Sequence, residues 1–421
     1  MRRMTLRLLS STAFIAGFAA PAFAQETFPS PSPDADVVII DQVQLGDVFA
    51  NMDVVVSGTA TGASAAATAT GNITTANSLD NDLDFDAAQQ QNGEVRAASL
   101  ISGDNVFGSP ARTITTAYGN SASSSTTNGT DFSTVTQTSN SDVDASSAIT
   151  LLEVGDVEMT TTASANVNQY QTENGTNRGY QVQTGNSNVT ATNEAQIGFV
   201  ANSGAIGATA TGNSVASYGS TTTSYNGAQQ IMADGTRVAS VSNAEISDGT
   251  NVAVSATSAG NNMKVENEFG YATLGRDVSN LYQENSADID TDSSLTLTEW
   301  AGVSGSTSYG VGNSALISNV GSDTGMYAIQ QNNGDVATLA TFEGGSNGGV
   351  GYASSTSIGN AATASLCHSC GSNPILSGKT AQLNNANITS SAYASTGHDG
   401  YISGSATAIG NSATYQSFST D

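Results

Sequence analysis

The sequence has little positive charge. Ten of its 421 residues are Lys or Arg, against 36 Asp or Glu, and three of the ten, Arg2, Arg3 and Arg7, lie at the N-terminus. Nucleic-acid binding needs basic patches that neutralise phosphate, and docking on anionic lipid needs them too. Neither function is expected of this chain.

Histidine, cysteine and proline are also scarce. Two histidines, His368 and His398, are too few for a multi-histidine metal site or a defensible Ser-His-Asp triad, and six prolines exclude a Pro-rich disordered chain. The two cysteines, Cys367 and Cys370, form a C-x-x-C pair without a surrounding βαβ pattern. In an exported protein this spacing favours a local disulfide that staples a loop, with metal binding and redox catalysis as alternatives. No cofactor and no metal site are expected.

The N-terminus has the pattern of an export signal. Residues 1–24 combine a basic start, an apolar run from about Leu8 to Ala20 and an A-x-A cleavage site at Ala22–Ala24. The run is too short for a permanent membrane-spanning helix. We expect cleavage between Ala24 and Gln25, a short linker over residues 25–35, and a repeat domain over residues 36–419.

Small residues dominate what remains, and they repeat. A Gly-Asn pair recurs at intervals of 48, 93, 48, 52, 47 and 51 residues, and Ala165-Asn166 stands at the midpoint of the double interval. Eight copies therefore follow a period near 48. The Gly-Asn pairs are Gly71-Asn72, Gly119-Asn120, Gly212-Asn213, Gly260-Asn261, Gly312-Asn313, Gly359-Asn360 and Gly410-Asn411.

A second motif, Q-x-x-N-G/S/A-x-V/I, lies about halfway between these pairs. The distance from its Val or Ile to the next Gly-Asn pair is nearly constant, as from Val48 to Gly71, so two unlike half-units alternate along the chain. The glutamines that align as one column are Gln42, Gln89, Gln137, Gln183, Gln330 and Gln382. The motif also matches at Gln283, and the copy that begins at Gln229 carries an insertion.

The half-units have the pattern of strand, tight turn and strand. Ile206, Ala208 and Ala210 alternate with small polar residues, and the Gly212-Asn213 pair that follows tolerates positive φ. We therefore predict an all-β fold, a single elongated β-solenoid of about sixteen rungs, each of about 23 residues. The residue two before each Gly-Asn pair is always small, which favours a narrow interior, and the aligned Gln and Asn residues are expected to stack as amide ladders.

Paired carboxylates and tyrosines are weaker candidates for function. Two acidic runs, Asp80–Asp84 and Asp288–Asp292, lack calcium-loop spacing, so solvated surface is the main interpretation, with weak calcium binding and catalysis as alternatives. Tyr118, Tyr218 and Tyr309 flank Gly-Asn pairs and could stack on sugars, although strand propensity also explains them.

The half-units resemble the curlin-type repeats of bacterial functional amyloid. Tyr180–Gln196 is the closest stretch, with Gln183, Gly185, Asn186 and Gln196 at the repeat's Gln, Gly and Asn positions. The leader, the length, the acidic balance and the near-complete coverage by repeats also resemble the holdfast anchor proteins of stalked bacteria, in particular the D family. That resemblance implies a surface protein that tethers an adhesive polysaccharide to the envelope, export through a curli-type outer-membrane channel, and SDS-resistant assemblies. The alternation of unlike half-units departs from curlin.

We therefore expect a structural adhesion protein of the cell surface or outer membrane, without catalysis. Its expected partners are a holdfast-type polysaccharide, other anchor subunits and the export channel. The open ends of a solenoid favour head-to-tail association into an amyloid-like polymer, although a discrete rod is also compatible with the repeats. The alternatives are a secreted β-helix enzyme acting on polysaccharides and a discrete carbohydrate-binding rod.

Overall fold

A computed structural model describes residues 34–275, 281–346, 348–368 and 373–419. The predicted leader, with its cleavage point at Ala24 and Gln25, lies outside these residues. Every element in the described part is a β-strand, and every paired strand is parallel to its neighbour, so the all-β prediction is confirmed. No described helix is long and apolar enough to cross a membrane.

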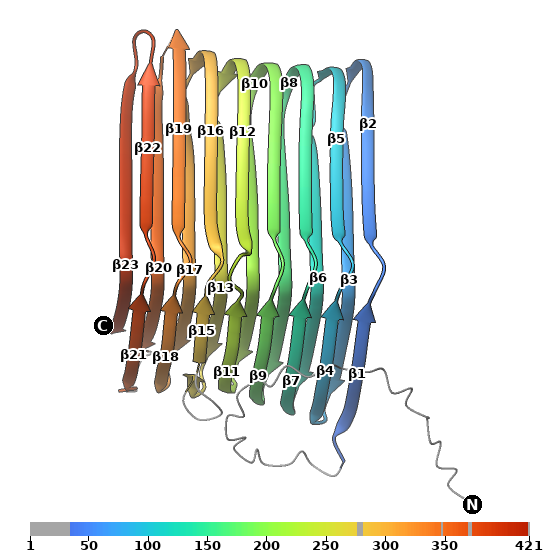
Figure 1. Ribbon diagram of the computed structural model, residues 1–421, viewed down its shortest axis with the longest axis vertical. Helices are drawn as coiled ribbons and strands as arrows, with labels where there is room; N and C mark the ends of the chain where they lie inside the picture. The colour runs from blue at the N-terminus through green and yellow to red at the C-terminus, as the bar shows by residue number, and fades with distance from the viewer. Residues whose placement is uncertain (1–33, 276–280, 347, 369–372, 420–421) are drawn as a thin grey trace, which may run out of the picture. The chain divides into compact units, whose positions relative to one another are not determined.

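The strands form a coil that turns eight times over the described residues. Each of the eight coils contains a first strand, a second strand that continues it after a short corner, and a return strand that runs back (Figure 1). The first strands are β1 (Asp36–Gln44), β4 (Leu83–Gln91), β7 (Thr130–Ser139), β9 (Thr176–Gly185), β11 (Thr223–Met232), the pair β14 (Ala272–Leu274) and β15 (Leu281–Asn285), β18 (Thr324–Asn332) and β21 (Leu376–Asn384).

The other two sets build the second, larger sheet. The second strands are β2 (Val48–Ala60), β5 (Val95–Val106), β12 (Arg237–Thr250), β16 (Asp288–Ala301), β19 (Val336–Ser346) and β22 (Ile388–Thr396). The return strands are β3 (Ala63–Leu79), β6 (Ala111–Thr127), β13 (Val252–Glu268), β17 (Val303–Val320), β20 (Val350–His368) and β23 (Tyr401–Ser419). In the third and fourth coils, β8 (Val143–Glu173) and β10 (Val189–Ser220) each contain both.

The strand register corrects the predicted rung. Gln42 pairs with Gln89, and Thr209 pairs with Thr257, so the chain returns to the same place after one full period of the repeat, not after one half-unit. The two half-units are the two layers of one coil. The prediction of sixteen rungs is therefore wrong, and eight coils stack instead. The physical reason is that only identical half-units can place Gln on Gln and Asn on Asn along the stack.

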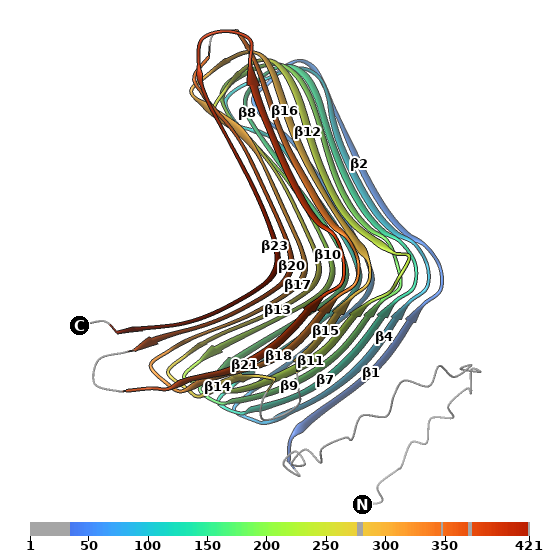
Figure 2. The ribbon, with the colours of Figure 1, turned by 60° about the vertical axis from the view of Figure 1, so that its left-hand side comes forward.

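Each coil is bent, and the return strands follow the inner side of the bend (Figure 2). The Gly-Asn pair lies in mid-strand opposite the ends of the first strands, since Asn72 donates to the carbonyl oxygen of Gln90. The first and second strands together form the outgoing layer, which spans residues 36–60 in the first coil. The return strand spans only residues 63–79, because it follows the shorter path on the inner side of the bend. The pairs lie in mid-strand, so the prediction of a tight turn there is wrong. The chain reverses between second and return strands, as at Asn251 (φ 53°), and again where return strands end, as at Asp80 (φ 59°) and Asn128 (φ 59°).

The interior between the two layers is narrow and mixed in polarity. Apolar side chains fill the part between second and return strands, where Trp300 and Phe342 meet edge to face at 5.1 Å. Near the bend, alanines of the return strands pack against larger apolar residues such as Val143 and Met232. Ala117, Ala163 and Ala210, two residues before the pairs, are fully buried there, as the sequence predicts.

Candidate functional site

A column of glutamines runs the length of the stack at the ends of the first strands. Each side-chain amide donates from Nε2 to Oε1 of the glutamine one coil earlier, at 2.7–2.9 Å. The same Nε2 donates to a backbone carbonyl of its own coil's return strand, such as Ile73 or Ser412, and so ties the two layers together. The members are Gln42, Gln89, Gln137, Gln183, Gln230, Gln283, Gln330 and Gln382.

A column of asparagines faces it from the return strands, with the opposite polarity. Each Nδ2 donates to Oδ1 of the asparagine one coil later, at 2.7–2.8 Å. It also donates to a backbone carbonyl of the next first strand, such as Gln90 or Leu383. The members are Asn72, Asn120, Asn166, Asn213, Asn261, Asn313, Asn360 and Asn411.

The structure brings all six predicted glutamines into one column and adds two that the prediction omitted. Gln283 matches the motif, so the sequence alone could have placed it in the column. Gln230, not Gln229, aligns with Gln183 because the insertion in that copy follows the strand. Asn166 takes its place in the asparagine column although an alanine precedes it where the other copies have glycine.

The glycines of the pairs are needed for close approach. A Cβ on Gly212 would lie 2.6 Å from the carbonyl oxygen of Gly260 and would also collide with the sulfur of Met232. Met232 in turn occupies the space that a side chain at Gly185 would need, one coil away. Small and large residues therefore alternate at the bend. A Cβ at Gly212 would require Met232 and the Gly260 backbone to shift, whereas the third coil accommodates Ala165 at the equivalent position.

These ladders are structural devices. Their amides are almost completely buried in the inner coils, and a buried amide left without a partner costs about 1–3 kcal/mol. Each step satisfies one donor and one acceptor, so the stack is stable only when coils are added in register. The ladders contribute order and stiffness along the stack and contain no nucleophile or acid–base pair.

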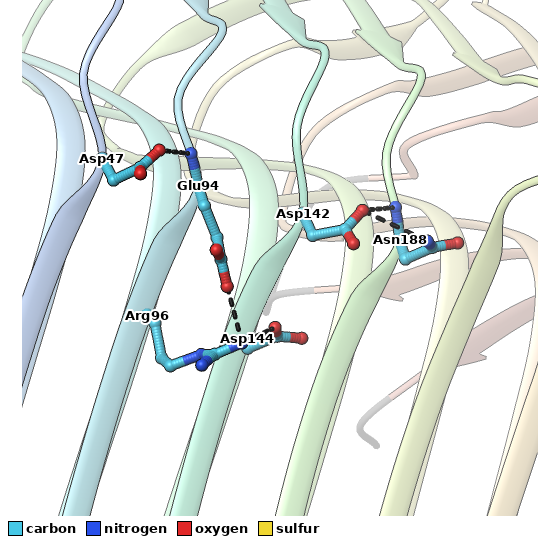
Figure 3. A network of polar contacts seen from close by, with 6 residues as sticks. All are labelled: Asp47, Glu94, Arg96, Asp142, Asp144 and Asn188. Atoms are coloured by element: carbon cyan, nitrogen blue, oxygen red, sulfur yellow. Dashed lines mark hydrogen bonds and ion pairs between the residues drawn. The ribbon is translucent and has the colours of Figure 1, made fainter.

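The outer corner, between first and second strands, carries a column rich in carboxylates (Figure 3). Asp47 accepts the backbone N–H of Glu94 at 2.9 Å, and Asp142 accepts that of Asn188 at 3.1 Å. Arg96 lies between two acids, 2.6 Å from Glu94 and 3.4 Å from Asp144. These carboxylates satisfy backbone donors at a corner where strand pairing is interrupted.

Among the residues that the structure describes, one carboxylate is fully buried inside the stack. Asp131 on β7 is fully buried and accepts hydrogen bonds from Ser124, at 2.7 Å, and from Ser133. Its neighbours along the column are Leu83 and Asn177, and no ion pair joins it to a cation in the described part of the chain. Burial raises the pKa of Asp131 from 3.8 to about 6, although the two serine hydrogen bonds lower it in part.

The acidic runs are divided between turns and surface. Asp80 and Asp82 accept hydrogen bonds from Asn128 and from the backbone of Thr130, both at 2.7 Å, which connects neighbouring turns. Asp290 pairs with Arg237 at 2.5 Å. Asp292 is half-buried, which raises its pKa, and lines a shallow hollow of about 380 Å³ together with Glu194 and Glu245. The described residues contain no cluster of three or more His, Cys, Asp or Glu suited to a metal ion.

The predicted disulfide cannot be placed, because Cys370 lies outside the described residues. Cys367 is half-buried at the end of β20, and its thiol contacts the carbonyl oxygen of His368 at 3.9 Å. Tyr118 and Tyr309 face outward from the return strands of the second and sixth coils, in adjacent rows, and Tyr218 lies on the other arm of the bend.

Comparison with known proteins decides the family. The family model for holdfast attachment protein D (HfaD) matches residues 56–335, which is more than half of the chain. The chain belongs to the holdfast attachment protein D family. Neither a curated protein nor a solved structure matches it. The match covers coils two to six completely and reaches into the seventh.

Membership of the family assigns a general role. The protein functions in holdfast attachment, a role that implies association with the cell surface or envelope. The ladders fit this role, since they are built to hold a stack together.

Proposed function

We propose that the protein is a cell-surface anchor that holds an adhesive polysaccharide to the outer envelope. The family match over residues 56–335 carries the proposal. The export signal at residues 1–24, with cleavage after Ala24, would deliver the chain to the surface, and a curli-type outer-membrane channel is the expected export partner.

The mechanism is mechanical. Backbone hydrogen bonds between parallel strands and the two amide ladders all run along the stack, so separating any two coils breaks many bonds at once. Repeated outward faces offer the same contact several times, and weak contacts add through multivalency.

The two ends of the stack favour association with further copies. In the first coil, the ladders leave the Nε2 donor of Gln42 and the Oδ1 acceptor of Asn72 without a ladder partner. In the last coil, they leave the Oε1 acceptor of Gln382 and the Nδ2 donor of Asn411. Head-to-tail stacking therefore pairs donor with acceptor in both ladders, while head-to-head stacking opposes like groups. This complementarity supports an amyloid-like polymer of anchor subunits.

Exposed apolar residues support the same association. In the first coil, Val37, Ile39 and Val43 are 60%, 71% and 59% exposed, while Asp84, Asp86 and Gln90 hold the equivalent positions in the second. Leu383 in the last coil is 51% exposed and would lie next to Val43 of a following copy. Burying such side chains contributes about 25 cal/mol per Å².

A polysaccharide-active enzyme is the second candidate, and one observation favours it. The hollow lined by Glu194, Glu245 and Asp292 contains carboxylates, of which Asp292 has a raised pKa, as a general acid requires. A discrete carbohydrate-binding rod is the form that the anchor would take without polymerisation.

The role is tested in cells that lack the protein. The anchor proposal predicts that adhesive polysaccharide is still made but is shed into the medium, which polysaccharide staining of cells and supernatant measures. Full retention of the polysaccharide on cells would contradict it. Loss of the whole polysaccharide would point to synthesis or processing, and the variant Asp292→Asn would then be assayed for glycan cleavage.

The polymer is tested separately, on SDS gels with and without formic acid. Wild-type protein should give high-mass species that collapse to monomer only in acid. Asn411→Asp keeps the acceptor used by Asn360 but replaces the terminal donor with a charge, so it should shift the protein toward monomer. Gln416→Glu adds the same charge to an exposed side chain of β23 and is the matched control. A polymer unaffected by Asn411→Asp would contradict head-to-tail stacking.

A further inference from the structure

We propose that the outward side of the return strands, here called the return face, binds an extended uncharged glycan that lies along the stack with about one sugar per coil. This inference rests on the proposed anchor function and names the surface and the ligand class. The return face is the side of the eight return strands that points away from the core, on the inner side of the bend (Figure 2).

The first argument is the distribution of charge. Of the chain's 36 acidic residues, only four lie in the return strands, namely Glu158, Glu173, Glu266 and Glu268. Two of the four are neutralised by ion pairs, Glu158 with Arg112 at 3.2 Å and Glu266 with Lys264 at 2.9 Å. The first and second strands and the turns hold most of the remaining acids. A strongly acidic protein thus keeps one whole face nearly free of charge.

The second argument is a column of threonines on this face. In-register pairing places one residue from each coil in a single row along the stack, and seven of the eight are threonine. All are half-buried or exposed, and none of the threonine hydroxyls makes a hydrogen bond within the described part of the chain. The row consists of Thr68, Thr116, Thr162, Thr209, Thr257, Tyr309, Thr356 and Thr407.

The spacing of this row fits a glycan. Parallel strands lie about 4.8 Å apart, which is close to the advance of one sugar in an extended polysaccharide with equatorial linkages. Each coil can therefore offer one hydroxyl, as donor or acceptor, to each successive sugar. Tyr309 stands in the same row and Tyr118 in the next, and both rings are partly exposed, so they can stack on the apolar face of a sugar.

The charge distribution selects the class of ligand. A neutral hydroxyl face binds a neutral polyhydroxyl chain without removing charges from water, which would be costly. An anionic glycan would be repelled by the protein's net charge of −26, and a cationic one would be drawn to the acidic outgoing layer. A hydrogen bond between neutral groups contributes only about 0.5–1.5 kcal/mol, so the repetition over eight coils is needed for useful affinity.

The test is affinity electrophoresis of the full mature protein in gels that contain a soluble polysaccharide. The probes are hydroxyethylcellulose (neutral, extended), pullulan (neutral, α-linked) and polygalacturonate (anionic). We expect retardation by hydroxyethylcellulose that persists in 0.5 M salt, and none by the other two. Retardation that salt abolishes, or equal retardation by pullulan, would overturn the proposal.

Variants assign the face. The quadruple change Thr116→Val, Thr162→Val, Thr209→Val and Thr257→Val removes four hydroxyls while keeping β-branched side chains. It should weaken the apparent affinity about tenfold or more. The matched control makes the same change on the outgoing layer, at Thr134, Thr136, Thr190 and Thr192, and should bind within about twofold of wild type. Equal binding by both variants, with circular dichroism and Tm unchanged, would overturn the assignment.

The two proposals fail separately. If cells lacking the protein retain their polysaccharide, the anchor function is wrong whatever the gels show. If those cells shed it, but the return-face variant restores retention as well as wild type does, the anchor function stands and the return face is not the binding surface. Should the quadruple variant fail to fold, the pair Thr162→Val and Thr209→Val provides the same comparison.

Discussion

Asp131 is predicted to make the stack less stable as the pH rises toward neutrality. Its side chain is buried between Leu83 and Asn177 and accepts hydrogen bonds from two serine hydroxyls, and the folded pKa is about 6 against 3.8 for an ordinary aspartate. Because the folded pKa is raised, the stability associated with the protonated form is present in full below about pH 3.8. It is lost as the pH rises through about 6.

The magnitude follows from the pKa difference. Each pKa unit corresponds to about 1.4 kcal/mol, so ionising Asp131 in the folded state costs roughly 3 kcal/mol at pH 7.5 relative to pH 3.5. Replacing it by asparagine removes the charge and keeps the shape. Asn177 pairs with residue 131 in the next coil, and its buried Oδ1 has no hydrogen-bond partner among the described residues, so it is available to accept from the new Nδ2. Asp131→Asn should therefore raise the free energy of unfolding by about 3 kcal/mol at pH 7.5 and by little at pH 4.

The assay is urea unfolding of wild type and Asp131→Asn, followed by circular dichroism at several pH values between 4 and 8. The difference between the two proteins is the informative quantity, because the other carboxylates cancel in it. Thr134→Asn, at an exposed position of the same strand β7, changes no titratable group and is the control, so its difference from wild type should be the same at every pH. A flat difference for Asp131→Asn, or a variant less stable at pH 7.5, would refute the reasoning.

Three further predictions test other parts of the stack. Asn213→Ala removes a buried ladder step and the hydrogen bond to the carbonyl oxygen of Ile231, so it should lower the unfolding free energy by about 3 kcal/mol. Asn411→Ala at the open end should lower it by under about 1 kcal/mol. Equal losses would contradict the ladder's role. Gly312→Ala should lower the unfolding free energy by about 2–3 kcal/mol, since the new Cβ would lie 2.6 Å from the Gly359 carbonyl oxygen and would also meet Asn332. Gly404→Ala, with open space around the new Cβ, should be nearly neutral when both variants are compared in thermal melts. Arg96→Gln breaks only exposed ion pairs with Glu94 and Asp144, so its cost should stay below about 1 kcal/mol and vanish in 1 M salt; a larger or salt-independent loss would be unexpected.

Much of this architecture can be predicted from the sequence, because a stack in register repeats its side chains. The Gln and Asn columns follow from the period near 48 and from the constant lag between the two motifs. The inward small residues, such as Ala163 and Ala210, follow from the alternation around Gly212-Asn213. Strand content is predictable for the same reason, since β-branched and small residues alternate throughout.

The size of the coil could not be predicted from the half-unit length alone. The lag between the two motifs fits either a short rung or one layer of a longer one, and only the pairing of Gln42 with Gln89 decides between them. The Gly-Asn pair misled in a similar way, because glycine serves tight turns and close backbone approach alike. At Gly212 the neighbours Gly260 and Met232 show that close approach is the reason.

The buried Asp131 and the uncharged return face had no local signal. Both depend on which strands become neighbours. Asp131 looks like any strand-start aspartate until Leu83 and Asn177 are placed beside it. The threonine row appears only when Thr162, Thr209 and Thr257 are aligned at the correct period.

The most direct test of the account is the distance between spin labels in protein whose Cys367 and Cys370 are replaced by serine. Labels at Thr209 and Thr257, which lie one full period apart in the sequence and pair in adjacent return strands, should show strong dipolar broadening. Labels at Thr190 and Ser214, about half a period apart, lie on opposite layers of one coil and should show little broadening. Strong broadening for the second pair, without it for the first, would contradict the eight-coil stack and restore the shorter rung.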